Sequence, residues 1–518
     1  MQLSTRLAAF ALALAVGSAA WNALAAAQTQ DAMTSNTVVT TNSNMSADAG
    51  GATPRAARTH DAEGPSAVDA PGGVEASAEA STDDSSSPSV KWSEVQPAWG
   101  TTNVSRVTLR ESSSANSPIV ATLELPAYDS AEILDWTRER VKVKFAANAD
   151  AEGGTRRRDY EGWVAWNAMR PGAMAVVLDA ETGEVFARVP LSANLSSATF
   201  SPDGRRVLFH GGGSNLAYEA SVKDFKPTRV LESTGTGGFG TLFYGADGEL
   251  RAPVWTVTYH ESGTEMSLDV LRVGAGGAVV RTRVASKAAT KFLVAPEGKT
   301  AVLVRGEGAA DAWGAGGGDA SMRRATVEVL DLDTLSVVTS FVVYGADAPD
   351  EAGEFALSRD GTQLYVKGSG EGAGVAVFDT RSGGRVRDIQ LDATDAQWSS
   401  LASASPVGGA LLMSVWRADE EHGSVQGGVW LGGEKPVAAD EGVDFVVEAG
   451  GARYAVNSKG TQFLKLDEKN RVRERLDIER PDRKRDAEAD DELMVYGLVA
   501  TPDAKHLIIF VGMPECGC

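Results

Sequence analysis

The sequence GVAVFDTRSGGRVRDIQL, residues 374–391, contains the structural unit from which most of this chain is built. Apolar residues flank a turn cluster at residues 379–384, which predicts two short antiparallel strands joined by a tight turn. Asp379 closes the first strand, where its carboxylate can accept hydrogen bonds from the turn amides, and Gly383 tolerates the left-handed conformation that the turn needs. The unit is therefore predicted to be a β-hairpin.

Related hairpins recur along the chain, and an Asp closes the first strand at Asp179, Asp331, Asp379 and Asp467. Seven hairpins align, at residues 175–190, 216–231, 267–284, 325–341, 374–391, 428–438 and 463–476. Seven further turns alternate with them, at Ser201, Gly245, Ala295, Ser358, Ser405, Glu448 and Thr501. A period of about 50 residues with four strands is typical of a β-propeller blade. The sequence thus predicts an all-β protein with a seven-bladed propeller.

The ends of this array indicate how the ring closes. It begins with the hairpin at residues 175–190 and finishes with only the turn half of a unit, at residues 494–512. Pairing these two halves completes one blade and removes the sheet edges that an incomplete blade exposes. We expect the propeller to span residues 172–518. The stretch ATFSPDGRRVLF resembles TolB-type and WD-repeat-like bacterial propellers, and VEVLDLDTLSVVTSF is similar to YVTN-type propellers.

The first ninety residues have the composition of an export signal followed by a tether. Residues 1–27 hold one cation, Arg6, then an apolar run and a small-residue pattern at residues 25–27, which together predict a secretory signal peptide. Residues 28–90 are rich in Ala, Ser, Thr, Gly and acidic residues, which predicts a disordered linker. We therefore expect an exported protein, periplasmic or extracellular, with no membrane span after signal cleavage.

Residues 91–171 differ from both neighbours and predict a small barrel. Five short strands are expected, at residues 107–110, 119–123, 131–136, 141–145 and 162–166. The stretches VTLRESSSANSPIVATL and EGWVAWNAM resemble the first hairpin and the closing strand of the bacterial SH3-like family. That resemblance implies a domain that binds cell-wall peptides or protein ligands, or serves as a spacer. Trp136, Tyr160 and Trp166 are the predicted ligand-binding residues.

The formal net charge of −21 repels a nucleic-acid backbone, so nucleic acid is excluded as a partner. An envelope protein or a cell-wall peptide remains as the expected partner. The predicted topology places His210, His260 and His422 on one rim of the propeller, together with Cys516 and Cys518. Imidazoles and thiolates suit Zn or Cu, so these five residues form a hypothetical metal site. The alternative is that polar residues accumulate in loops, with the two cysteines joined as a disulfide, paired between molecules or left as free thiols.

The leading functional hypothesis is an exported envelope protein that binds or scaffolds a protein or ligand through an SH3-like domain and a propeller. One alternative is a propeller enzyme with an axial metal or quinone cofactor, and another is a sensor of cell-wall peptides. The cofactor is unknown, and no nucleophile motif such as Gly-x-Ser-x-Gly is present. Fold alone does not choose among these hypotheses.

Overall fold

The computed structural model describes most of the chain after residue 87. The described residues are 88–102, 104, 106–124, 130–149, 156–211, 214–234, 238–260, 263–285, 289–295, 299–306, 325–344, 354–368, 374–391, 399–407, 409–419, 423–433, 435–478 and 494–512. Their regular elements are β-strands, apart from the 3-10 helix η1 (Trp166–Ala168), and they form eight sheets. Among these residues, no helix has the length and apolar character needed to cross a membrane.

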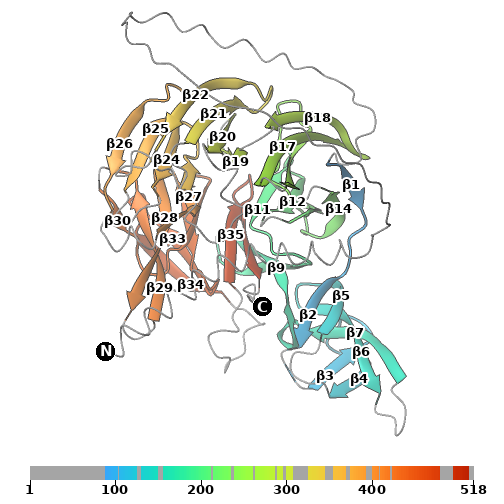
Figure 1. The fold of residues 1–518 in the computed structure, drawn as a ribbon. Helices are drawn as coiled ribbons and strands as arrows, with labels where there is room; N and C mark the ends of the chain where they lie inside the picture. The colour runs from blue at the N-terminus through green and yellow to red at the C-terminus, as the bar shows by residue number, and fades with distance from the viewer. Residues whose placement is uncertain are drawn as a thin grey trace, which may run out of the picture. The chain divides into compact units, whose positions relative to one another are not determined.

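Seven of the eight sheets are propeller blades, numbered here in chain order (Figure 1). Blade 1 has β11 (Ser197–Phe200), β12 (Arg206–His210), β13 (Leu216–Ser221) and β14 (Pro227–Ser233). Blade 2 has β15 (Phe243–Tyr244), β16 (Leu250–His260), β17 (Gly263–Gly274) and β18 (Gly277–Ala285). Blade 3 has β19 (Ala289–Val294), β20 (Thr300–Gly306), β21 (Ala325–Asp331) and β22 (Val337–Val343).

The next three blades repeat this antiparallel order, in which each strand pairs with the one that follows it. Blade 4 has β23 (Glu354–Leu357), β24 (Gln363–Lys367), β25 (Val375–Asp379) and β26 (Arg385–Ile389). Blade 5 has β27 (Ser399–Val407), β28 (Ala410–Asp419), β29 (Gly423–Leu431) and β30 (Val437–Ala438). Blade 6 has β31 (Phe445–Ala449), β32 (Ala452–Val456), β33 (Gln462–Leu466) and β34 (Val472–Asp477). The predicted hairpins are thus the third and fourth strands of each blade.

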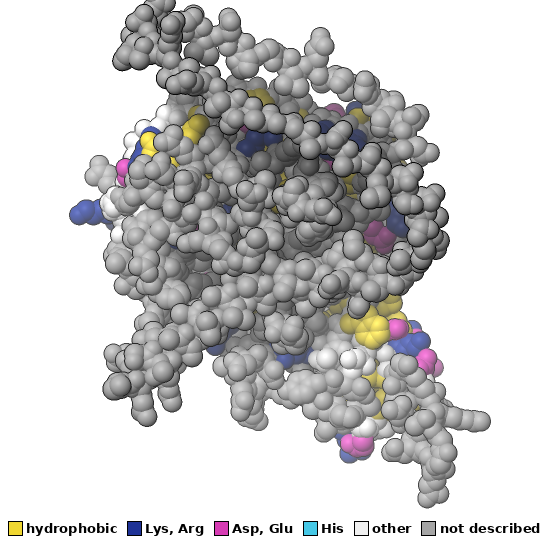
Figure 2. Space-filling view, viewed as in Figure 1, with side chains coloured by type: hydrophobic (Ala, Val, Ile, Leu, Met, Phe, Trp, Pro, Cys, Tyr) yellow, Lys and Arg dark blue, Asp and Glu magenta, His cyan; other side chains and the backbone are white. Residues whose placement is uncertain are grey.

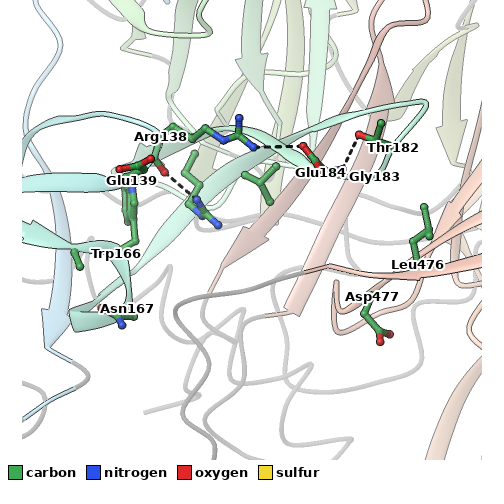
Figure 3. Close-up of a pocket in the computed structure, with 12 residues that line it drawn as sticks. Arg138, Glu139, Trp166, Asn167, Thr182, Gly183, Glu184, Leu476 and Asp477 are labelled. Atoms are coloured by element: carbon green, nitrogen blue, oxygen red, sulfur yellow. Dashed lines mark hydrogen bonds and ion pairs between the residues drawn. The ribbon is translucent and has the colours of Figure 1, made fainter. Parts of the chain in front are cut away.

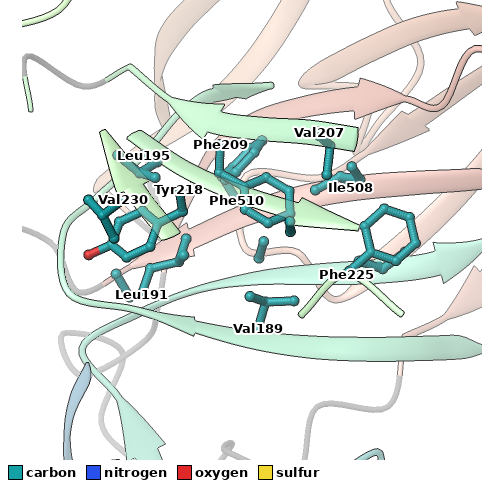
Figure 4. Close-up of a cluster of buried hydrophobic side chains, with 14 residues drawn as sticks. Val189, Leu191, Leu195, Val207, Phe209, Tyr218, Phe225, Val230, Ile508 and Phe510 are labelled. Carbon is teal, nitrogen blue, oxygen red and sulfur yellow. The ribbon is translucent and has the colours of Figure 1, made fainter. Parts of the chain in front are cut away.

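Blade 7 joins the two ends of the propeller, which confirms the predicted closure. It has the order β10 (Val185–Leu191), β9 (Ala173–Asp179), β36 (His506–Gly512) and β35 (Met494–Ala500). The first strands β19, β23, β27, β31, β35 and β11 contact one another in that order, so the first strand of a blade is innermost. Apolar side chains fill the space between blades 7 and 1, where the rings of Phe209 and Phe510 lie 5.8 Å apart (Figure 4).

The hairpin turns have the hydrogen bonds predicted from the sequence. The Asp379 carboxylate accepts from the Ser382 amide at 2.7 Å, and that of Asp331 accepts from the Thr334 amide at 2.8 Å. The hydrogen bond from Thr334 lowers the pKa of Asp331 below its ordinary value. Gly383 has a φ of 70°, as the turn requires, and Leu335 occupies the matching place in its hairpin with a φ of 56°. Turn chemistry therefore sets the strand pairing of the blades.

A pair of glycine substitutions separates backbone strain from packing. A Cβ at Gly383 would lie 2.7 Å from ring carbons of Phe341 in blade 3, whereas at Gly204, with a φ of 66°, nothing lies within 4 Å. Both positions are left-handed, so we expect Gly204→Ala to cost about 1 kcal/mol. Gly383→Ala should cost at least about 2 kcal/mol because Phe341 must also move. Urea unfolding of both variants measures the difference, and equal losses would contradict it.

The eighth sheet forms a small domain, called here the small β domain (residues 98–171). Its strand order is β4 (Ile119–Glu124), β3 (Arg106–Arg110), β7 (Arg156–Ala165), β6 (Arg140–Ala149), β5 (Ser130–Trp136), β2 (Ala98–Thr102) and β8 (Met169–Pro171). The five strands expected from the sequence correspond to β3 to β7, and β2 and β8 extend the sheet. A separate apolar core that includes Leu109, Ile133 and Phe145 holds the domain together.

The residues just before the small β domain belong to the propeller. The sequence places residues 91–93 in the barrel, but β1 (Val90–Ser93) pairs antiparallel with β14 as a fifth strand of blade 1. Val90 is buried in the core between blades 1 and 2. The Trp92 indole donates to the Gly274 carbonyl at 2.9 Å and lies 3.7 Å from the Arg229 guanidinium. Val90 and Trp92 alternate along the strand, so both side chains face the blades, Val90 buried and Trp92 half-buried, which explains this placement.

Removal of the Trp92 ring should release β1. We expect Trp92→Ala to destabilise the protein by about 2 kcal/mol, because a half-buried indole, its hydrogen bond and its contact with Arg229 are lost. Amide hydrogen exchange should accelerate in β14 and at Thr234 just after it, whose amide donates to the Ser89 carbonyl at 2.9 Å. Trp99→Ala is the matched control because Trp99 is 53% exposed. Unchanged exchange in β14 of the Trp92 variant would disprove the role of β1.

Candidate binding site between the small β domain and the propeller

The small β domain is attached to the propeller on both sides in sequence. Before it, β1 is paired to blade 1, and after it only Gly172 separates β8 from β9 of blade 7. Val95 and Trp136 also pack against the apolar cluster between blades 7 and 1. The small β domain is thus connected to the propeller through the chain at both ends and through apolar contacts at its base.

Polar contacts add to this junction (Figure 3). The Arg188 guanidinium of β10 donates to the Arg138 carbonyl at 3.0 Å. Arg138, in the turn between β5 and β6, forms an ion pair with Glu184 at 3.6 Å. Lys226 of blade 1 pairs with Asp135 of β5 and lies 5.7 Å from the Trp136 ring centroid. Exposed pairs of this kind contribute little to stability.

A cleft with a volume of about 700 Å³ lies at this junction. Its walls come from three parts of the chain: the small β domain, the β9–β10 hairpin of blade 7 and strand β34 of blade 6 (Figure 3). The lining residues are Arg138, Glu139, Ala165, Trp166, Asn167, Thr182, Gly183, Glu184, Val185, Arg188, Leu476 and Asp477. The cleft therefore offers guanidinium groups, carboxylates and an amide to one ligand.

Two of these walls are rigid for identifiable reasons. The turn that carries Thr182 and Glu184 is held by Asp179, whose carboxylate accepts from the Thr182 amide at 2.8 Å. That hydrogen bond also lowers the pKa of Asp179. Trp166 is buried, and its indole nitrogen donates to the Thr137 carbonyl at 3.0 Å. The charged tips thus project from a fixed frame, which favours binding without a large ordering cost.

The three predicted ligand-binding aromatic residues all contribute to the apolar core of the small β domain. Trp166 lines the cleft. Trp136 is half-buried and packs against both the core of the small β domain and the cluster between blades 7 and 1. Tyr160 is half-buried and packs against the core of the small β domain. Of the three, only Trp166 lines the cleft described here, and the roles of Trp136 and Tyr160 in binding stay predictions.

The predicted metal-site residues fall only partly within the described residues. His210 ends β12, and His260 ends β16. His422, Cys516 and Cys518 lie outside the described residues. Among the residues that the structure describes, no group of three or more His, Cys, Asp or Glu side chains is arranged to hold a metal ion. The five-residue metal site therefore stays a prediction.

His210 has an environment that the sequence does not reveal. Its side chain is fully buried, and Nε2 lies 2.9 Å from the Thr199 hydroxyl, which itself donates to the Leu242 carbonyl at 2.6 Å. No side chain or backbone group among the described residues bonds Nδ1. Burial lowers the pKa of His210 to about 3. The ring is therefore neutral at physiological pH.

No protein-family model matches the sequence, and no curated protein matches it either. Among solved structures, the chain is similar to one titled "Dihydro-heme d1 dehydrogenase NirN in complex with DHE". The similarity covers 66% of this chain and 74% of that chain, with 15% sequence identity and a TM-score of 0.37. The likeness concerns the fold alone, and we take neither a ligand nor a reaction from it.

The sequence does not single out most of the residues that line the cleft. Arg138, Glu184 and Arg188 look like ordinary charges on strand ends and turns, and Leu476 and Asp477 lie almost 300 positions further along the chain. The one indication in the sequence is the predicted closure of the propeller, because closure places blade 6 beside blade 7. Closure alone does not indicate which side chains line the cleft, because that also depends on the orientation of the small β domain.

The buried imidazole should make stability depend on pH. The unfolded chain binds a proton at His210 near pH 6.5, whereas the folded ring, with its pKa of about 3, does not. Stability is therefore lost as pH falls below about 6.5, by up to about 1.4 kcal/mol per pH unit from this group. We expect His210→Gln to have a shallower loss between pH 6.5 and 4.5 in urea unfolding. Identical slopes for variant and wild type would contradict the buried neutral ring.

Proposed function

We propose that this protein is an exported binding module of the cell envelope, and that its ligand site is the cleft between the small β domain and the propeller. The observation that carries this proposal is the convergence of three distant chain segments on one cleft of about 700 Å³ with both charge signs and a buried indole. The export signal predicted over residues 1–27 supports the compartment.

The chemistry of the cleft supports a peptide ligand that carries both positive and negative groups. Arg138 and Arg188 can bind carboxylates, and Glu139 and Glu184 can bind ammonium groups. Leu476 of β34, which is half-buried, offers an apolar surface in the wall of the cleft. Stem peptides of the cell wall contain free carboxylates and a diamino acid, so they match this pattern. The resemblance of the small β domain to the bacterial SH3-like family supports the same ligand class.

Co-sedimentation with purified peptidoglycan, followed by calorimetry with soluble muropeptides, tests the proposal. We expect the mature chain to bind both probes. Arg138→Glu should weaken muropeptide binding by about tenfold, because the guanidinium that binds a carboxylate of the ligand is replaced by a second negative charge. Arg106→Glu is the matched control, since Arg106 is an exposed arginine of the same domain, paired with Glu124 and outside the cleft.

Two results would overturn the proposal. The first is a wild-type chain that binds neither peptidoglycan nor muropeptides. The second is an Arg138→Glu variant that binds as tightly as Arg106→Glu, because the bound peptide would then lie elsewhere. Thermal unfolding of both variants should match that of the wild type within about 2 °C, since both side chains are exposed.

A further inference from the structure

The outer strands of the propeller show how this chain protects its sheet edges. The edge of β14 is covered by β1. Charged residues occupy β18, β26 and β34, and β10 contains Arg188 and Pro190. Strand β30 has only 2 residues. Each of these features discourages pairing with another chain.

Strand β22 has none of these features. Its sequence, VVTSFVV, holds no charged residue and no proline over 7 positions. Val337, Val338 and Val342 are 51%, 64% and 47% exposed, and Ser340 is exposed between them. Hydrophobic side chains reach the surface in the upper left of Figure 2, where Figure 1 shows the outer strands of blades 3 and 4. An apolar, uncharged outer strand is unusual in a chain with a net charge of −21.

One edge of β22 has no strand beside it among the described residues. Its other edge pairs with β21 from Ala325 and Val343 to Leu330 and Val337. The backbone hydrogen bonds described outside strand ladders include none from residues 337–343. Blade 1 shows that an outer strand of this propeller can accept a fifth strand, since β1 pairs with β14 over four residues.

We propose that β22 pairs antiparallel with β22 of a second copy of this chain, as a two-fold symmetric contact. With Ser340 opposite Ser340, Val337 faces Val343, Val338 faces Val342 and Thr339 faces Phe341, so neutral residues meet at every position. The same arrangement in β26 would place Arg387 against Arg387. Like charges directly opposite one another destabilise a strand pair, whereas β-branched and aromatic pairs stabilise it. The strand is therefore self-complementary.

Sedimentation equilibrium of the mature full chain tests this contact. We expect the wild type to shift from monomer to dimer as its concentration rises to about 200 µM, the range of a weak edge contact. Ser340→Lys should weaken the dimer about tenfold, because two ammonium groups meet at the symmetry axis. Val386→Lys is the matched control, since Val386 is 53% exposed on the outer strand of the next blade and should leave dimerisation unchanged.

A charge swap makes the test specific to this register. Ser340→Lys and Ser340→Glu should each dimerise more weakly than the wild type when alone, and an equimolar mixture should form a heterodimer in preference to either homodimer. A wild type that stays monomeric throughout overturns the proposal. A Ser340→Lys variant that dimerises as tightly as the wild type overturns it too, because the contact then lies on another surface. Matching circular dichroism and thermal unfolding of the variants exclude misfolding, since Ser340 is exposed.

Discussion

The ladder between β9 and β36 is the interaction on which the ring depends, because it joins the two ends of the propeller. It runs from His506 opposite Asp179 to Gly512 opposite Ala173. Side chains alternate along these strands, so one face packs against blade 1 and the other against blade 6. A broken ladder would therefore expose two interblade cores and two sheet edges at once. Among the strands that the structure describes, no other blade combines the two ends of the propeller.

The same closure determines where a ligand could bind. Because β8 leads into β9 through Gly172, the small β domain is joined directly to the closing blade, and β1 ties its other end to blade 1. The β9–β10 turn, held by Asp179, then faces the turn that carries Arg138. Blade 6 supplies the third wall through Leu476. Its Cδ1 atom would lie 3.1 Å from a Cβ added at Gly183, so the two walls are close together. The cleft is a product of ring closure and of the doubly anchored domain.

The repeated part of this fold could be predicted from the sequence, and the unique part could not. Asp379 and Gly383 specify their hairpin locally, so the seven blades and their closure follow from counting such units. Strand β1 could not be predicted, because Val90 and Trp92 follow a low-complexity segment and a strand of four residues shows little hydrophobic pattern. The cleft could not be predicted either, because its residues come together only through tertiary packing. His210 was expected on a loop rim, but β12 extends to it and buries its ring.

Strands β1 and β14 show what makes an added strand specific in this propeller. Lys91 of β1 lies opposite Glu232 of β14, with their charged groups 3.4 Å apart, and Trp92 lies over Arg229. The edge of β14 thus selects a strand with a matching cation and an aromatic ring. Strand β22 has no charge to match, so a charged strand placed on it would lose hydration without gaining a counter-ion. Its edge therefore selects a neutral, β-branched strand, and β22 itself has that composition.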